Sequence, residues 1–192
     1  IDKYYQYQVG LLKRKEDVIR LIDEKGLMTD ELKEKILGAS KLVEVEDLYR
    51  PYKEKKKTKA TDAINNGLEP LAKQIMSFPL SGSFDELAKK YINDNVKTTL
   101  DAVSGAKYII AEWISDNAYY RKWIRTYIYR NGNISSSIKK TANDEAKIYE
   151  MYYNYTETLK TVKPHRVLAL NRGEKEKILT VNIDIDEEKI IN

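Results

Sequence analysis

The longest helical pattern in the chain covers residues 99–130, and it limits the possible folds more than any other feature. Apolar residues recur along its first half at steps of three and four, the spacing that places side chains on one face of a helix: Leu100, Val103, Ala106, Ile110 and Trp113. Ser115–Asp116 offers an N-cap within the pattern, so we predict two consecutive helices, and Asn131–Gly132 ends the second. With only 4 prolines and 8 glycines to interrupt it, the chain favours long helices and few strands.

Further helices are predicted before residue 99. We expect them over residues 2–25, 29–38 and 62–66, with one more opened by Pro70 and one capped by Ser83 and Glu86. Gly26 is placed to end the first of these helices, and Thr29 is a plausible N-cap for the second. Residues 77–83 form the most loop-like stretch. The N-terminal part therefore reads as an array of helices.

The period changes after Gly132. Residues 133–140 resemble a short strand, and residues 178–186 alternate apolar and polar side chains as a half-buried strand does. We expect these two strands to pair antiparallel, with helices over 143–153 and 164–173 between them. The predicted fold is mostly α, a multi-helix array with a small antiparallel two-stranded sheet near the C-terminal end. We divide it into an N-terminal helical region, 1–132, and a small α+β segment, 133–192, packed on it.

Composition excludes several classes of protein. The chain has no apolar stretch of about 18 residues, so no membrane association is expected, and it does not open as a secretory signal does. It contains no cysteine, which excludes disulfides and cysteine-bound metals and fits a cytoplasmic location. Lys and Arg number 34 against 30 Asp and Glu, a formal charge of +4. That excess is too small to indicate a nucleic-acid-binding protein by itself.

Three long strings resemble the Tex family of bacterial transcription accessory proteins, which is related to a eukaryotic transcription elongation factor. They are VEDLYRPYKEKKKTKATDAINNGLEPLA over 45–72, DAVSGAKYIIAEWISDNA over 101–118, and HRVLALNRGEKE over 165–176. They follow the family's order and approximate spacing, so the resemblance covers essentially the whole chain.

This resemblance implies a fragment of a larger multidomain protein. Family members are several times longer and continue into an RNase-H-like domain, helix-hairpin-helix motifs and a C-terminal OB-fold RNA-binding domain, none of which is recognisable here. Ile1 is not an initiator methionine, which also favours an excised piece. The RNA binding that the family owes to its OB-fold is therefore not assigned to these residues.

The basic loop, residues 50–59, is the main candidate site for nucleic acid. Six cations lie in ten residues and only Glu54 offsets them: Arg50, Lys53, Lys55, Lys56, Lys57 and Lys59. Such a loop can neutralise phosphates, and the flanking Tyr49 and Tyr52 could stack on bases. The alternative is a solvated loop, or one that docks on acidic parts of the missing domains. The two tyrosines and Pro51 read more simply as a packed turn.

Other chemistry-bearing residues have simpler explanations. His165, the only histidine, has no nucleophile motif beside it and stands at a predicted helix start. The acidic run Asp184, Asp186, Glu187 and Glu188 lacks the ligand order of a calcium loop. Core packing explains Trp113, Trp123 and most of the 15 tyrosines first. A second basic cluster, Arg166, Arg172, Lys175 and Lys177, fits the end of a helix and stays unassigned.

Two functions remain compatible with these residues. The first is a helical scaffold and interaction module of a transcription accessory factor that binds RNA or DNA through its other domains, with those domains and the transcription machinery as partners. The second is a module that contacts phosphates directly through the basic loop. An enzyme is not expected, because the chain has no Gly-rich phosphate loop, no paired metal ligands and no nucleophile elbow, and nothing indicates a catalytic residue, metal or cofactor.

Overall fold

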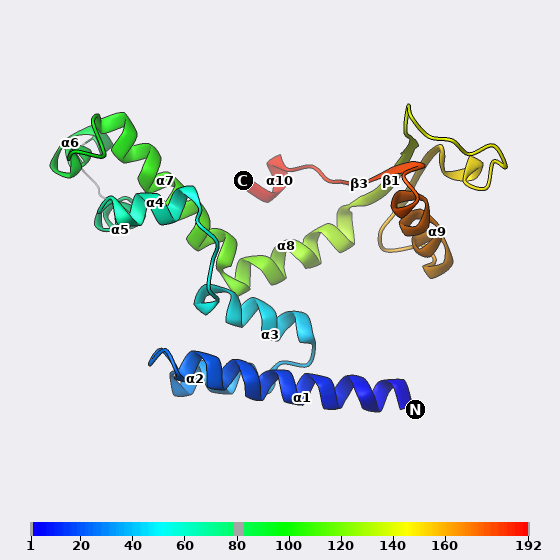
Figure 1. The fold of residues 1–192 in the computed structure, drawn as a ribbon, viewed down its shortest axis with the longest axis horizontal. Helices are drawn as coiled ribbons and strands as arrows, with labels where there is room; N and C mark the ends of the chain where they lie inside the picture. The colour runs from blue at the N-terminus through cyan, green and yellow to red at the C-terminus, as the bar shows by residue number, and fades with distance from the viewer. Residues whose placement is uncertain (1, 79–82, 192) are drawn as a thin grey trace. The chain divides into compact units, whose positions relative to one another are not determined.

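The computed structural model describes residues 2–78 and 83–191, and the chain folds into two compact units, 1–121 and 122–192. Helices predominate, as the periodicity predicts (Figure 1). Among the described residues, no helix is long and apolar enough to cross a bilayer. Our division into domains at residue 132 stays a prediction.

The first unit begins with three helices around a core of their own (Figure 1): α1 (Asp2–Asp23), α2 (Asp30–Gly38) and α3 (Leu42–Tyr49). Val18 and Ile22, one helical turn apart, are fully buried against Ile36 and Val45. Gly26, with φ +67°, takes the left-handed conformation that ends α1. The side chain of Thr29 accepts a hydrogen bond from the Leu32 N–H, which confirms the predicted cap of α2.

A second core lies between α7 (Thr99–Asp116) and the shorter helices α4 (Lys59–Asn65), α5 (Glu69–Met76) and α6 (Phe84–Ala88). Gly105 allows close packing, since a Cβ there would lie 2.3 Å from Leu68 Cδ1. Ser83 caps α6 by accepting a hydrogen bond from the Glu86 N–H. Residues 79–82 of the predicted loop lie outside the described residues.

The long pattern divides into α7 and α8 (Ala118–Asn131), but one residue later than we predicted. Asn117, and not Ser115–Asp116, caps α8. Its Oδ1 accepts hydrogen bonds from the N–H groups of Tyr119 and Tyr120 at 2.9 and 3.2 Å. Asp116 is the last residue of α7, and its carboxylate does not cap α8.

The second unit contains a three-stranded antiparallel sheet, so our prediction of two strands is wrong. Its order is β2 (Asn154–Thr158), β1 (Asn133–Ile138) and β3 (Leu179–Asp184), with Ser136 opposite both Tyr155 and Val181. The predicted antiparallel pair is β1–β3. The missed strand, NYTET, carries mostly polar side chains and offered little apolar alternation to detect.

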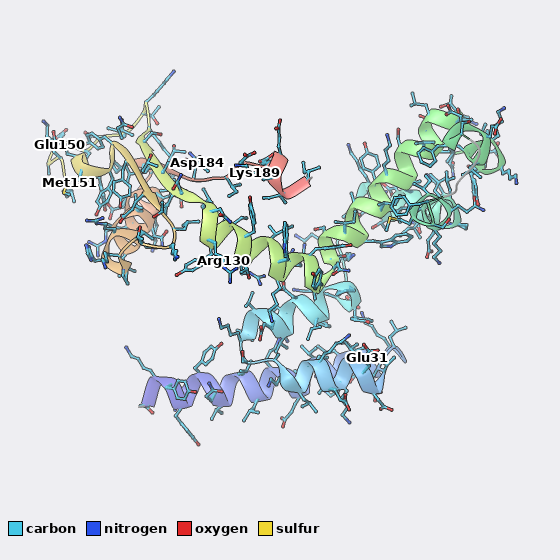
Figure 2. All side chains as sticks on the ribbon, turned by 180° about the vertical axis from the view of Figure 1, so that it is seen from behind. Glu31, Arg130, Glu150, Met151, Asp184 and Lys189 are labelled. Carbon is cyan, nitrogen blue, oxygen red and sulfur yellow. The ribbon has the colours of Figure 1, made fainter. Side chains whose placement is uncertain are left out.

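The predicted helix over 143–153 is also wrong, because these residues form turns and a 3-10 helix, η3 (Glu150–Tyr152). The Asp144 carboxylate accepts hydrogen bonds from the N–H groups of Ile148 and Tyr149 and from the Tyr153 hydroxyl. A short acidic side chain that binds nearby backbone in this way competes with a helix. Glu150 and Met151 project from the end of this segment (Figure 2).

One helix covers the sheet: α9 (Pro164–Lys175) packs on β3, and α10 (Glu188–Ile191) follows the last strand. Leu170 and Leu179 are fully buried in the core, and Gly173 lies so close to the strand that a Cβ would come within 2.7 Å of Leu179 Cδ1. The helix begins at the predicted proline and continues two residues beyond Gly173.

Candidate functional site

The basic loop joins the two helical cores of the first unit and is anchored at both ends. Arg50 opens a 3-10 helix, η1 (Arg50–Tyr52), that continues from α3. At the other end Thr58 caps α4, since its hydroxyl accepts a hydrogen bond from the Thr61 N–H. The loop is therefore short and fixed at both ends, so the backbone positions of its cations are defined.

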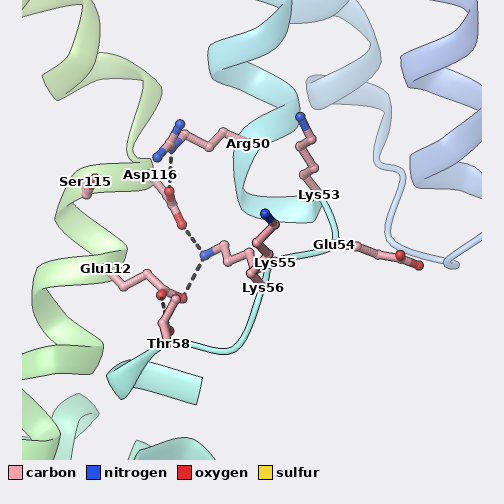
Figure 3. A pocket seen from close by; sticks show the side chains of 9 residues that line it. All are labelled: Arg50, Lys53, Glu54, Lys55, Lys56, Thr58, Glu112, Ser115 and Asp116. Atoms are coloured by element: carbon pink, nitrogen blue, oxygen red, sulfur yellow. Dashed lines mark hydrogen bonds and ion pairs between the residues drawn. The ribbon is translucent and has the colours of Figure 1, made fainter. Parts of the chain in front are cut away.

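Two of these cations converge on Asp116 at the end of α7 (Figure 3). Arg50 Nε donates a hydrogen bond to Asp116 Oδ1 at 2.8 Å, and the Lys55 ammonium pairs with Asp116 Oδ2. Asp116 is only 6% exposed. A buried carboxylate is costly unless it is paired and hydrogen-bonded, and both conditions are met here.

Glu112, one turn earlier on α7, completes the attachment. Lys55 Nζ lies 2.8 Å from Glu112 Oε1, and the Thr58 hydroxyl donates to Glu112 Oε2 at 3.1 Å (Figure 3). Burial by itself lowers the pKa of Lys55, but hydrogen bonds to Asp116 and Glu112 outweigh it and raise that pKa above its ordinary value. Lys55 is consequently a charged cross-link between loop and helix.

The remaining cations of the loop are arranged differently. Lys57 pairs with Asp62 at 3.2 Å on the surface, and Lys59 Nζ lies 5.0 Å from the centre of the Tyr108 ring, a cation–π distance. Lys53 and Lys56 have no ion-pair partner among the residues that the structure describes. Whether any of the six cations contacts nucleic acid stays a prediction.

A hollow of about 410 Å³ lies beside these ion pairs. Charged and polar side chains line it (Figure 3): Arg50, Lys53, Glu54, Lys55, Lys56, Thr58, Glu112, Ser115 and Asp116. Apolar and aromatic side chains, which line most small-molecule sites, are missing from this set. The lining suits an ionic contact better than an organic ligand.

A second ion pair connects α3 with the start of α8 inside the same unit. Arg121 Nε donates to Asp47 Oδ1 at 2.7 Å, and Asp47 is 5% exposed. Arg121 also donates to the Ser115 carbonyl at 3.2 Å. Together with the pairs of Asp116, it forms what we call the charged joint: Asp47, Arg50, Lys55, Glu112, Asp116 and Arg121.

The sequence pointed to only two members of this joint as site residues, Arg50 and Lys55, and did not point to Arg121. Asp47 and Glu112 were not considered, and Asp116 was interpreted only as a helix cap, although Glu112 and Asp116 are four residues apart and so share one face of α7. These two acidic residues on one helix face were the only sequence signal for an acidic partner of the basic loop. The long sequence separation between loop and helix hid which cations they would meet.

The other candidates lie apart from the joint. His165 is exposed at the start of α9, and its imidazole forms no hydrogen bond with the described residues. Asp184 ends β3, and Asp186 pairs with Lys189 of α10 at 3.3 Å (Figure 2 labels Asp184 and Lys189). Within residues 2–78 and 83–191, no three His, Cys, Asp or Glu side chains are grouped as metal ligands.

Core packing explains only part of the aromatic residues. Trp113 packs against the core around α7, and Tyr49 and Tyr149 are buried. By contrast, Tyr119 and Trp123 on α8 are 72% and 42% exposed. The interpretation of the aromatic residues as core therefore fails for α8.

These features define a helix-rich module in which ion pairs of buried carboxylates connect the helices of the first unit. The Tex central region-like family model matches residues 81–191, more than half of the chain. The chain therefore belongs to the Tex family.

Three relatives illustrate the match. Uncharacterized protein YdcI of Bacillus subtilis is 52% identical over 187 residues, which are 96% of this chain and 26% of that protein. Transcriptional accessory protein Tex of Neisseria gonorrhoeae is 30% identical over 92% of this chain and 23% of that protein. S1 RNA-binding domain-containing protein 1 of Homo sapiens is 30% identical over 93% of this chain and 18% of that protein. The chain thus spans about a quarter or less of these relatives.

Proposed function

We propose that this chain is a helical scaffold and interaction module of a Tex-family transcription accessory protein, without catalytic activity of its own. The observation that carries the proposal is the charged joint. Asp116 is buried between the two helical cores of the first unit and is neutralised by Arg50 and Lys55. Its function would be to hold these cores, and whatever docks on them, in one arrangement.

The physics of the joint favours a single geometry. A buried carboxylate that loses its cation keeps the full cost of desolvation, so an arrangement that separates Asp116 from its cations is disfavoured. Asp47 with Arg121, and Asp116 with Arg50, each connect elements far apart in the sequence. Each pair therefore favours the arrangement of helices in which its carboxylate stays paired.

In this proposal, the rest of the parent protein binds the nucleic acid. One relative is named a transcriptional accessory protein and another an S1 RNA-binding domain-containing protein, and each is much longer than this chain. We therefore assign the nucleic-acid binding that these names indicate to the other parts of the parent, with those parts and the transcription machinery as partners of the scaffold.

Distance measurements within the first unit test the scaffold. The chain has no cysteine, so spin labels can be placed on exposed positions of α1 and α7 by Lys13→Cys and Lys107→Cys. A scaffold gives a narrow distribution of distances between the labels, and Asp116→Ala broadens or shifts it. Glu69→Ala, which removes the exposed pair with Lys73, is the matched control and leaves the distribution unchanged. The scaffold proposal would be rejected if the doubly labelled chain gave the same distribution of distances with and without Asp116→Ala.

Direct phosphate contact by the basic loop is the second candidate, and it now rests on Lys53 and Lys56. Both line the hollow beside Arg50 and have no ion-pair partner among the described residues. If the loop binds nucleic acid, Lys53→Glu with Lys56→Glu abolishes most of the binding at low salt. Fluorescence anisotropy with labelled oligonucleotides measures it, and unchanged affinity in this variant rejects the loop as a binding site.

A further inference from the structure

One face of α9 is solvent-exposed from end to end. His165, Leu168, Arg172 and Lys175 follow one another at steps of three and four residues, so their side chains share a face, and all four are exposed. Leu168, in the middle, is 68% exposed. Asn171, on the same side of the helix, is exposed as well. The opposite side, with Leu170 and Gly173, is the one packed on β3.

This α9 face, defined as His165, Leu168, Asn171, Arg172 and Lys175, carries no acidic side chain. At 3.6 residues per turn, Glu174 points about 120° away from Leu168 around the helix axis. Glu176 lies past the end of α9, where its carboxylate accepts a hydrogen bond from the Tyr149 hydroxyl at 2.8 Å. The face is therefore cationic along its second half and nowhere anionic.

The cations of the α9 face have no ion-pair partner in the part of the chain that the structure describes, although the charge of Arg172 acts on Tyr149. Arg172 and Lys175 form no side-chain hydrogen bond or ion pair with the described residues, in contrast to Arg166 on the packed side, which pairs with Glu157 at 2.7 Å. The helix dipole favours cations in the last turn. That effect does not explain a polar His165 in the first turn or an exposed leucine between the two ends.

We propose that the α9 face binds duplex DNA, with Arg172 and Lys175 on the phosphates. This goes beyond the scaffold, because it gives the second unit a ligand of its own. An α-helix is about 10–12 Å wide and fits the major groove of B-form DNA, about 12 Å wide. The narrow, deep major groove of an RNA duplex does not admit it.

The residues of the face suit different parts of that ligand. The guanidinium of Arg172 and the ammonium of Lys175 neutralise phosphates, which positions the helix without reading sequence. Asn171 and His165 offer hydrogen-bonding groups for base edges, and Leu168 offers an apolar surface for a thymine methyl group. Two phosphate contacts make a weak site, so the affinity depends strongly on salt.

The test is a titration of the 192-residue chain with fluorescently labelled duplex DNA, duplex RNA and single-stranded RNA at several salt concentrations. Arg172→Gln with Lys175→Gln removes both charges and keeps good helix formers, and circular dichroism verifies the fold. Lys140→Gln with Lys160→Gln is the matched control, because both lysines are exposed in the same unit and lie outside α9.

We expect duplex DNA to bind tightest and the α9 variant to bind it roughly tenfold or more weakly at low salt. The slope of log affinity against log salt should fall by about 0.9 for each lost phosphate contact, so by about two in total. The control variant keeps the affinity and slope of the unchanged chain. No binding at low salt, equal binding by the α9 variant, or tighter binding to RNA overturns the proposal. None of these outcomes affects the distances that test the scaffold.

Discussion

Asp116, buried at the end of α7, accepts a hydrogen bond at 2.8 Å from Nε of Arg50, a residue 66 positions earlier in the chain. Arg50 belongs to the loop that the sequence marks as basic, and Asp116 belongs to the helix that the sequence marks most clearly. Part of the basic loop, which the sequence suggested as a phosphate-binding site, therefore forms a contact inside the protein. The charge of a segment therefore does not by itself indicate an external ligand.

Replacing Asp116 by alanine should lower the free energy of unfolding of the first unit by about 2 kcal/mol. The loss stays below the roughly 3–5 kcal/mol of a fully buried pair, because the Arg50 side chain is 47% exposed and can be solvated. Urea unfolding followed by circular dichroism measures it. Glu69→Ala, at an exposed pair, should change stability by less than about 0.5 kcal/mol, and equal effects of the two changes would contradict a structural joint.

Two glycine substitutions should have opposite effects. A methyl group on Gly105 would lie 2.3 Å from Leu68 Cδ1, so Gly105→Ala should destabilise the core around α7 by about 1–3 kcal/mol through overpacking. A methyl group on Gly10 in α1 would have no neighbouring atom within 4 Å. Gly10→Ala should therefore stabilise the chain by about 0.5–1 kcal/mol through helix propensity. Thermal melts compare them, and a stabilising Gly105→Ala would show that the packing is looser than described.

The second unit should lose stability in acid. Hydrogen bonds from Tyr155 and Arg166 lower the pKa of Glu157 below its ordinary value of 4.5. A lowered folded-state pKa gives stability that is complete above pH 4.5 and is lost as the pH falls through the lower value. Glu157→Gln should be less stable at pH 7 and show a weaker pH dependence below about 4.5. Chemical unfolding at a series of pH values measures both, and parallel pH profiles would exclude Glu157 as the cause.

Lysines of the basic loop should differ in their effect on stability. Lys55→Glu places a third carboxylate beside Asp116 and Glu112 and should cost about 2–4 kcal/mol. Lys53→Glu changes the charge of the same loop by the same amount but removes no ion pair among the described residues, so stability should change by less than about 0.5 kcal/mol. Differential scanning calorimetry compares the two variants. A similar melting temperature for both would mean that Lys55 is not a cross-link.

Helices were predictable where local signals agree. Thr29 before a helical pattern and Pro164 at the start of another mark ends that the structure reproduces. Local signals failed where a side chain competed with the backbone, as Asp144 does in the segment expected to be helical. The polar strand β2 was missed because it is recognised through its pairing with β1, not through its own residues.

The sequence by itself determined the helical character of the chain, its family and the positions of its basic segments, because periodicity, caps and motifs are properties of neighbouring residues. Only the tertiary structure decided which cations are used internally. Arg50 and Lys55 meet Asp116, whereas Arg172 and Lys175 meet no acidic partner among the described residues. The physical reason is distance: an ion pair depends on separation in space, and residues 66 positions apart become neighbours only when the helices between them have packed.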